Sequence, residues 1–126
     1  MDLDLHNVHV LITGSAGGIG LATAKQFLTH GALVSAHYRS TKATLESDDQ
    51  CSRAIQEGRL VCVQGDVTSE EDVERMFDEA EKAMGRPVAV LVGEYGVGKK
   101  ADDGMRFSVL RKAVPWAQKS DEVAPW

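Results

Sequence analysis

Short runs of β-branched and aliphatic residues alternate with longer runs of helical periodicity between residues 8 and 92, and this alternation constrains the fold most strongly. The apolar runs predict strands at residues 8–13, 32–38, 59–64 and 88–92. Continuous apolar strands separated by helices are typical of a parallel sheet with helices on both faces. The connections between such strands are right-handed crossovers. The expected fold class is therefore α/β, doubly wound and of Rossmann type.

The first two helices are predicted from apolar spacing. Residues 18–31 predict a helix that ends at Gly31, and its expected core-facing side chains are Ile19, Ala22, Phe27 and Leu28. A weaker helix is expected over residues 42–57, and Gly58 would end it. Its expected apolar positions are Leu45, Ala54 and Ile55.

The helix after the third strand has the strongest end signals. A capping box is predicted from the run Thr68, Ser69, Glu70 and Glu71. Gly85 and Pro87 would end the helix. The expected buried stripe consists of Val73, Met76, Phe77 and Ala80.

Size and charge limit the function classes. A chain of 126 residues suits one small domain and is too short for a cofactor domain plus a separate substrate domain. The net charge of −5 offers no basic face, so nucleic acid and anionic membrane surfaces are not expected partners. No apolar run approaches the roughly 18 residues that a membrane span needs.

The N-terminus and the cysteines indicate a cytoplasmic protein. The first ten residues carry two acids and no basic residue, which fits neither a secretory signal nor a transit peptide. Cys51 and Cys62 lack Cys-x-x-Cys spacing and are expected to be reduced, with Cys62 buried in a strand. No metal site is expected, because no metal-ligand spacing connects the four histidines, His6, His9, His30 and His37, which we expect to be structural or solvent-facing.

A glycine-rich loop, "ITGSAGGIG" at residues 12–20, joins the first strand to the first helix. Gly14 allows a tight turn, whereas Gly18 and Gly20 remove side chains where backbone meets a pyrophosphate or where helix meets sheet. The helix N-terminus adds N–H donors and partial positive charge. The loop is therefore a candidate nucleotide site, although a simple strand-to-helix turn is the alternative.

The pattern Thr13-Gly14-x-x-x-Gly18-x-Gly20 resembles the cofactor signature of the short-chain dehydrogenase/reductase family. Asp66-Val67 resembles the family's adenine-contacting acid and its neighbour, and residues 88–92 are similar to its fourth strand. The likeness covers residues 5–92 and implies the strand order 3-2-1-4. It implies a dinucleotide site formed by Gly14, Ser15, Gly18, Ile19, Gly20, Arg39, Ser40, Asp66 and Val67. For Asp66, a role in capping the next helix remains an alternative.

The end of the second strand bears on the choice of cofactor. An acid there would bind the ribose 2′-hydroxyl of NAD, whereas a base would suit the 2′-phosphate of NADP. Tyr38 stands in the acid's usual place with Arg39 beside it, which favours NADP over NAD. The alternative is that Arg39 is only a solvated residue at the strand end.

No catalytic residue can be assigned. The resemblance implies a Ser, a Tyr with a Lys four residues later on one helix, and an Asn, all in a later part of the chain. Tyr95 and Lys99 match the Tyr-x-x-x-Lys spacing, but two intervening glycines disfavour the helix that such a pair needs. The run from Gly93 to Lys99 also resembles a phosphate loop, but Lys100 stands where a Ser or Thr must hold Mg²⁺.

The family likeness stops at Val92, which separates a half-domain at residues 1–92 from a mostly irregular or disordered tail at residues 93–126. Three hypotheses follow. The first is that the chain is an NADP(H)-binding fragment without catalysis. The second is that its tail is translated intron or a mispredicted gene product, since codons for residues 93–95 can contain a splice donor. The third is that it is a non-enzymatic interaction module. A family-type oligomer is not expected, because the later helices are missing.

Overall fold

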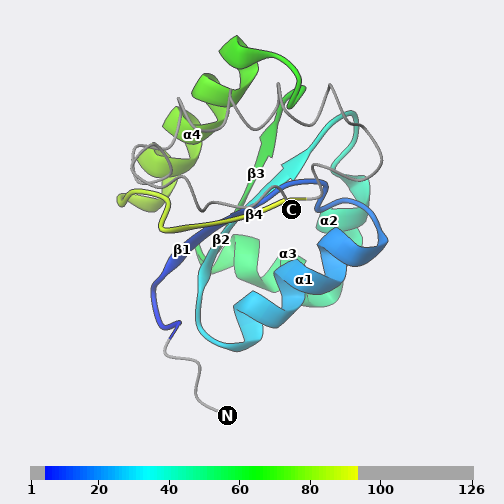
Figure 1. Ribbon diagram of the computed structural model, residues 1–126. Coiled ribbons are helices and arrows are strands. Elements are labelled where there is room, and N and C mark those ends of the chain that lie inside the picture. The colour runs from blue at the N-terminus through cyan, green and yellow to red at the C-terminus, as the bar shows by residue number, and fades with distance from the viewer. Residues whose placement is uncertain (1–4, 94–126) are drawn as a thin grey trace.

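The computed structural model describes residues 5–93, which fold around a four-stranded parallel sheet (Figure 1). The strands are β1 (His9–Ile12), β2 (Leu33–Tyr38), β3 (Leu60–Gln64) and β4 (Val90–Val92). Their order is β3-β2-β1-β4 and every pairing is parallel, which confirms the predicted topology. The fourth strand is shorter than predicted, although the Ala89 amide still donates to the His9 carbonyl over 2.9 Å.

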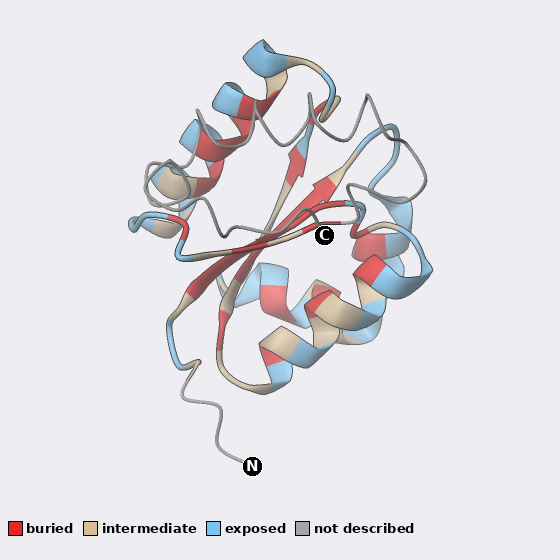
Figure 2. Ribbon diagram, in the orientation of Figure 1, coloured by how far each residue is buried: buried red, intermediate tan, exposed pale blue. Residues whose placement is uncertain are grey.

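Helices cover both faces of the sheet, as the alternating sequence predicts. The helices are α1 (Gly18–Thr29), α2 (Ala43–Ser47), α3 (Asp49–Gln56) and α4 (Glu70–Met84). On one face α4 packs with Leu11, Val63 and Leu91; on the other, α1, α2 and α3 pack with Val10 and Val34. Figure 2 shows the buried residues along the strands and on the sheet-facing sides of the helices. The central strand β1 is therefore buried on both faces.

Helix α4 confirms its predicted core face and end, but its cap is shifted by one residue. The buried side chains are Val73, Met76, Phe77 and Ala80, as expected. The helix ends at Gly85, which adopts the left-handed conformation with φ of 70°. At the start, the Ser69 hydroxyl accepts a hydrogen bond from the Asp72 amide over 3.3 Å. The N-cap is thus Ser69 rather than Thr68, because Thr68 bonds to Asp66 instead.

The predicted core face of α1 is wrong in part. Ile19, expected inside, is 75% exposed, Ala22 is also exposed, and Phe27 is half-buried. Leu28 is buried as expected, and the other buried positions are Gly20 and Ala24. Gly20 lets the helix lie close to the loop before it, and in the first two turns the large apolar side chain that packs against the core is Leu21, which is half-buried.

The second predicted helix is two helices separated at Asp48. The Asp48 carboxylate accepts a hydrogen bond from the Cys51 amide over 3.0 Å and pairs with Lys25 over 2.9 Å. These two contacts, the Cys51 amide first, lower the pKa of Asp48. Leu45 and Ala54 are buried as predicted, whereas Ile55 is 37% exposed, and the buried Cys51 joins the core instead. Cys62 is only half-buried.

Several predictions concern residues outside the described part of the chain. The tail at residues 93–126 is described only at Gly93, which is buried, so the Tyr95 and Lys99 pair and the phosphate-loop resemblance stay untested. Within residues 5–93, no helix has the length and apolar content needed to cross a bilayer.

Candidate functional site

The candidate nucleotide-binding residues gather at the carboxyl ends of the strands. The glycine loop follows β1, and Arg39 directly follows β2. Asp66 is the second residue after β3. The chain leaves β1 through α1 on one face of the sheet, whereas β4, on the other side of β1, is reached through α4 on the opposite face (Figure 1). Sheets of this kind bind ligands in the crevice at such a switch point.

Glycine stands at different positions of the loop for different physical reasons. Gly14 adopts a φ of +65°, which residues with a side chain rarely adopt. A Cβ on Gly20 would overlap the Gly14 carbonyl oxygen, so only glycine lets α1 approach the loop. Among residues 5–93, apart from the adjoining residues and the helix's own backbone, a Cβ on Gly17 or Gly18 would meet no atom within 4 Å. The protein therefore does not itself require glycine at those two positions, which leaves room for a ligand to approach the backbone.

The N-terminus of α1 is open to an anion. Its N-cap is Gly17, which provides no side-chain cap, and its first turn contains no acidic residue. The amides at a helix start have no partner within the helix and carry partial positive charge. Beside them stands the exposed side chain of Ile19. The loop therefore presents hydrogen-bond donors and an apolar surface together, which suits a pyrophosphate group.

Ser15 is placed inside the loop. It is fully buried, and its hydroxyl donates to the Ile12 carbonyl over 2.6 Å. Its amide donates to the His37 carbonyl over 2.8 Å. Its side chain therefore holds the loop against the end of β1, and its backbone amide holds the loop against the end of β2.

The two residues after β2 are exposed and lie at the carboxyl edge of the sheet. Arg39 and Ser40 are both exposed, and Tyr38 is half-buried. Within residues 5–93 the Arg39 guanidinium has no hydrogen-bond or ion-pair partner, while the Gln64 side chain donates to the Arg39 carbonyl over 2.8 Å. The backbone of Arg39 is therefore fixed, and its charge is available to a ligand.

The loop after β3 has a structural role of its own. Asp66 Oδ1 accepts hydrogen bonds from the amide of Thr68 over 2.9 Å and from its hydroxyl over 2.7 Å. The Asp66 amide donates to the Asp72 carboxylate over 2.8 Å, and Val67 packs against the core on the α4 side. The carboxylate thus helps to shape the turn before α4, in line with the capping alternative, while it also lies at the carboxyl edge of the sheet.

Sequence reasoning missed the role of His37. This side chain is 4% exposed; its Nδ1 accepts from the Gly14 amide over 3.0 Å, and its Nε2 lies 2.7 Å from the Gly65 carbonyl oxygen. Burial is the main cause that lowers the pKa of His37. The sequence shows only a histidine next to the end of an apolar strand, which does not reveal these two partners.

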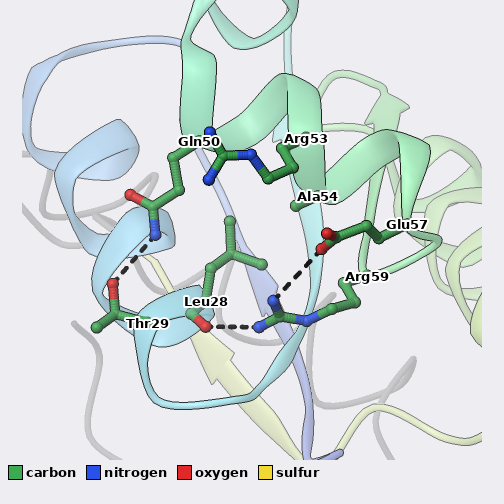
Figure 3. A pocket seen from close by; sticks show the side chains of 7 residues that line it. All are labelled: Leu28, Thr29, Gln50, Arg53, Ala54, Glu57 and Arg59. Carbon is green, nitrogen blue, oxygen red and sulfur yellow. Dashed lines mark hydrogen bonds and ion pairs between the residues drawn. The ribbon is translucent and has the colours of Figure 1, made fainter.

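A separate pocket of about 230 Å³ lies between α3 and the C-terminal end of α1, away from the glycine loop (Figure 3). Its polar groups pair with one another. The Arg59 guanidinium donates to the Leu28 carbonyl and pairs with Glu57, and the Gln50 amide donates to the Thr29 hydroxyl over 3.0 Å. The Gln50 contact joins α1 to α3, the Arg59 contact with Leu28 joins α1 to the segment before β3, and we assign the pocket no ligand.

The described part of the chain offers no Tyr–Lys helical pair. Tyr38 and Lys42 have the spacing, but Tyr38 ends β2 and Lys42 precedes α2, so they do not share a helix face. No cluster of three His, Cys, Asp or Glu side chains within residues 5–93 could hold a metal ion.

Comparison with known sequences decides the family. A sequence model described as short chain dehydrogenase matches residues 8–116, which is most of the chain and extends past residue 92. The chain belongs to the short-chain dehydrogenase family. The glycine loop, the uncapped helix and the parallel sheet are thus those of a short-chain dehydrogenase, a family whose members bind NAD(P).

Individual relatives agree. The chain is 39% identical over 96 residues to 3beta-hydroxysteroid dehydrogenase 1 of Eggerthella lenta, covering 75% of this chain and 35% of that one. It is 36% identical over 95 residues to glucose 1-dehydrogenase of Gluconobacter oxydans, with the same two coverages. The crystal structure of glucose dehydrogenase of Caenorhabditis elegans has a TM-score of 0.69 at 26% identity, covering 91% of this chain and 52% of that one. The chain spans about a third of the length of these two curated relatives.

Proposed function

We propose that this short-chain dehydrogenase domain binds NADP(H) at the carboxyl edge of its sheet. The observation that supports this most strongly is the position of Arg39, whose guanidinium has no partner among residues 5–93 and follows β2 at the same edge as the uncapped N-terminus of α1. A pyrophosphate would lie against the amides at Gly18 and Ile19, and Arg39 would pair with a 2′-phosphate. In this family the bound cofactor donates or accepts hydride.

The residues of the chain would divide the work of binding. Gly17 and Gly18 leave the backbone accessible, Ile19 offers an apolar contact, and Arg39 with Ser40 recognises the phosphate end. Asp66 and Val67, after β3, would contact the adenine, as the family resemblance implies. Because all these groups are on short loops anchored to one sheet, the site is built before the cofactor arrives.

The preference for NADP is tested by titrating the purified chain with NADPH and with NADH while following nicotinamide fluorescence. The wild type is expected to bind NADPH more tightly, and Arg39→Ala is expected to remove most of that preference, since it loses about 1.5 to 3 kcal/mol of charge-assisted hydrogen bonding. Arg53→Ala, at an exposed arginine on α3, is the matched control. No binding of either cofactor at millimolar concentration contradicts the proposal.

We also propose that these 126 residues bind the cofactor without substrate turnover. Support comes from the two tyrosines of the chain: Tyr38 is at a strand end, and Tyr95 is separated from Lys99 by a segment with two glycines. Any carbonyl reduction or alcohol oxidation by the purified chain, above that of a Gly17→Asp variant, would overturn this part of the proposal.

A further inference from the structure

His37 lies beneath two loops of the proposed cofactor site. It is the next-to-last residue of β2 and is almost completely buried. The Gly14 amide donates to its Nδ1 over 3.0 Å, and its Nε2 lies 2.7 Å from the Gly65 carbonyl oxygen. One imidazole ring therefore links the loop after β1 to the loop after β3, across the end of the strand between them.

These two contacts require one protonation state of the ring. A backbone amide can only donate and a backbone carbonyl can only accept, so Nδ1 must be unprotonated and Nε2 must carry the proton. A charged imidazolium would direct its Nδ1 hydrogen at the Gly14 amide hydrogen. Burial lowers the pKa of His37, which favours the neutral form, while Asp66 is the charged group within residues 5–93 that acts on it in the opposite direction.

Backbone contacts bring both loops close to the same strand end but leave two groups to the side chain. The Ser15 amide donates to the His37 carbonyl over 2.8 Å, and the Gly65 amide donates to the Tyr38 carbonyl over 3.2 Å. The Gly14 amide and the Gly65 carbonyl are joined only through the imidazole among the contacts of the described residues. The spacing between the glycine loop and Asp66 therefore depends on this side chain.

We propose that His37 is a positioning residue of the cofactor site, whose neutral imidazole sets the distance between the glycine loop and the Asp66 loop. This inference rests on the proposed function above. The pyrophosphate and the adenine of a dinucleotide are covalently joined, so both loops must be correctly spaced for one molecule to contact both. An incorrect spacing weakens binding even though no group that touches the cofactor has changed.

The test compares His37→Leu with His9→Leu. His9 is an equally buried histidine, and its ring nitrogens contact the Ser35 hydroxyl over 2.7 Å and the Arg86 carbonyl over 3.0 Å. It lies at the opposite end of the sheet, at the start of β1. Both variants are expected to be less stable, but only His37→Leu should weaken NADPH binding by the folded protein, by roughly tenfold for the lost buried contacts. Circular dichroism identifies conditions in which each variant is folded.

His37→Asn separates positioning from general packing. Its side-chain oxygen can replace Nδ1 as acceptor for the Gly14 amide, but the shorter side chain has no atom in the place of Nε2, which lies 2.7 Å from the Gly65 carbonyl oxygen. Its NADPH affinity should therefore fall between that of the wild type and that of His37→Leu. Acidification should weaken binding more in the wild type than in His37→Asn, because only the wild type has an imidazole to protonate; titration of the cofactor itself affects both equally.

The outcomes separate the two proposals. A wild type that binds neither NADPH nor NADH contradicts the proposed function, and the inference with it. A wild type that binds, together with equal affinity in His37→Leu, or equal weakening in His9→Leu, overturns the positioning role alone. If His37→Leu does not fold, identical pH dependence of NADPH affinity in wild type and His37→Asn overturns it.

Discussion

The N-termini of α1 and α4 differ in the features that decide what a helix end can bind. In α4, the Ser69 hydroxyl accepts from the Asp72 amide, and the first turn holds the acids Glu70, Glu71 and Asp72. In α1, Gly17 provides no side-chain cap and the first turn holds no acid. Both helices pack on the same sheet, so the fold does not require the difference. The chain itself satisfies the end of α4, whereas the proposed function assigns the end of α1 to an anionic ligand.

The largest expected change in NADPH affinity comes from giving α1 a capped, acidic N-terminus like that of α4. In Gly17→Asp the extended N-cap conformation, φ of −122°, accepts a side chain, and the new carboxylate would cap the helix. Stability should be unchanged or higher, while NADPH affinity should fall by roughly a hundredfold, because like charges about 4 Å apart repel by several kcal/mol near a protein surface. Gly17→Asn, which caps without charge, is the control. Equal NADPH affinity in the two variants would contradict the electrostatic account.

A methyl group at Gly20 tests whether α1 must lie close to its loop. Because the new Cβ would overlap the Gly14 carbonyl oxygen, Gly20→Ala should lower the free energy of unfolding by roughly 2 to 3 kcal/mol. Urea denaturation measures the loss. Gly18→Ala, whose Cβ meets no atom from other segments of the described chain within 4 Å, should keep its stability while it weakens NADPH binding. Equal stability of both variants would show that the close approach is not needed.

Removing the cap of α4 should affect stability and leave binding unchanged. Ser69→Ala loses the hydrogen bond to the Asp72 amide and should lower the free energy of unfolding by about 1 kcal/mol. Its NADPH affinity should equal that of the wild type. Gly17→Ala is the matched change at α1, where no side-chain cap hydrogen bond exists to be lost, and it should reduce stability by less than Ser69→Ala does. A fall in NADPH affinity for Ser69→Ala would mean that the two helix ends are not separate in function.

Lower pH should have the smallest effect on the stability of the fold, and this effect comes from the two buried histidines, His37 and His9. Burial lowers the pKa of His37 and of His9 below 6.5 in the folded chain. As pH falls through 6.5, the unfolded chain takes up protons that the folded chain does not, so stability present above this pH is lost below it. The urea midpoint should therefore drop between about pH 7.5 and about pH 5.5. His37→Leu and His9→Leu should each reduce the drop; an unchanged drop in both would contradict these assignments.

The strands and α4 were predictable because their apolar residues stand out clearly from the polar and charged residues around them. Runs such as "VCV" in β3 are apolar on both sides, and the α4 stripe at Val73, Met76 and Phe77 lies among charged residues. The parallel order followed from the family resemblance and is confirmed by the pairing of β1 with β2 and β4. In these elements the burial of large apolar side chains decides the structure, and the sequence shows it directly.

The first helix was harder to predict, because close backbone approach decides its orientation. Gly20 faces inward because no side chain fits there against the Gly14 carbonyl, Ala24 lies in the core one turn later, and Ile19 is left exposed. Hydrophobic periodicity has no means to detect a contact face made of glycine and alanine. The division at Asp48 was missed for a related reason: an aspartate inside a polar run shows no sign of the Lys25 partner that reaches it from α1.

The site was predictable in its location and only partly in its roles. Glycine spacing located the loop, but only the structure shows that Ser15 is buried and that Asp66 also shapes a turn. His37 could not be assigned because its two partners, Gly14 and Gly65, are more than 20 residues away in the sequence. The choice of NADP over NAD and the cytoplasmic location stay predictions.

Chemical-shift mapping tests the central claim most directly, because it observes both helix ends in one sample. NADPH is titrated into the ¹⁵N-labelled chain while backbone amide resonances are followed. We expect saturable shifts at Gly17, Gly18 and Ile19 and at Arg39, with the amides of the first turn of α4 unchanged. Saturable binding that shifts the α4 amides and leaves Gly17 to Ile19 unchanged would contradict the assignment of the cofactor site to the glycine loop.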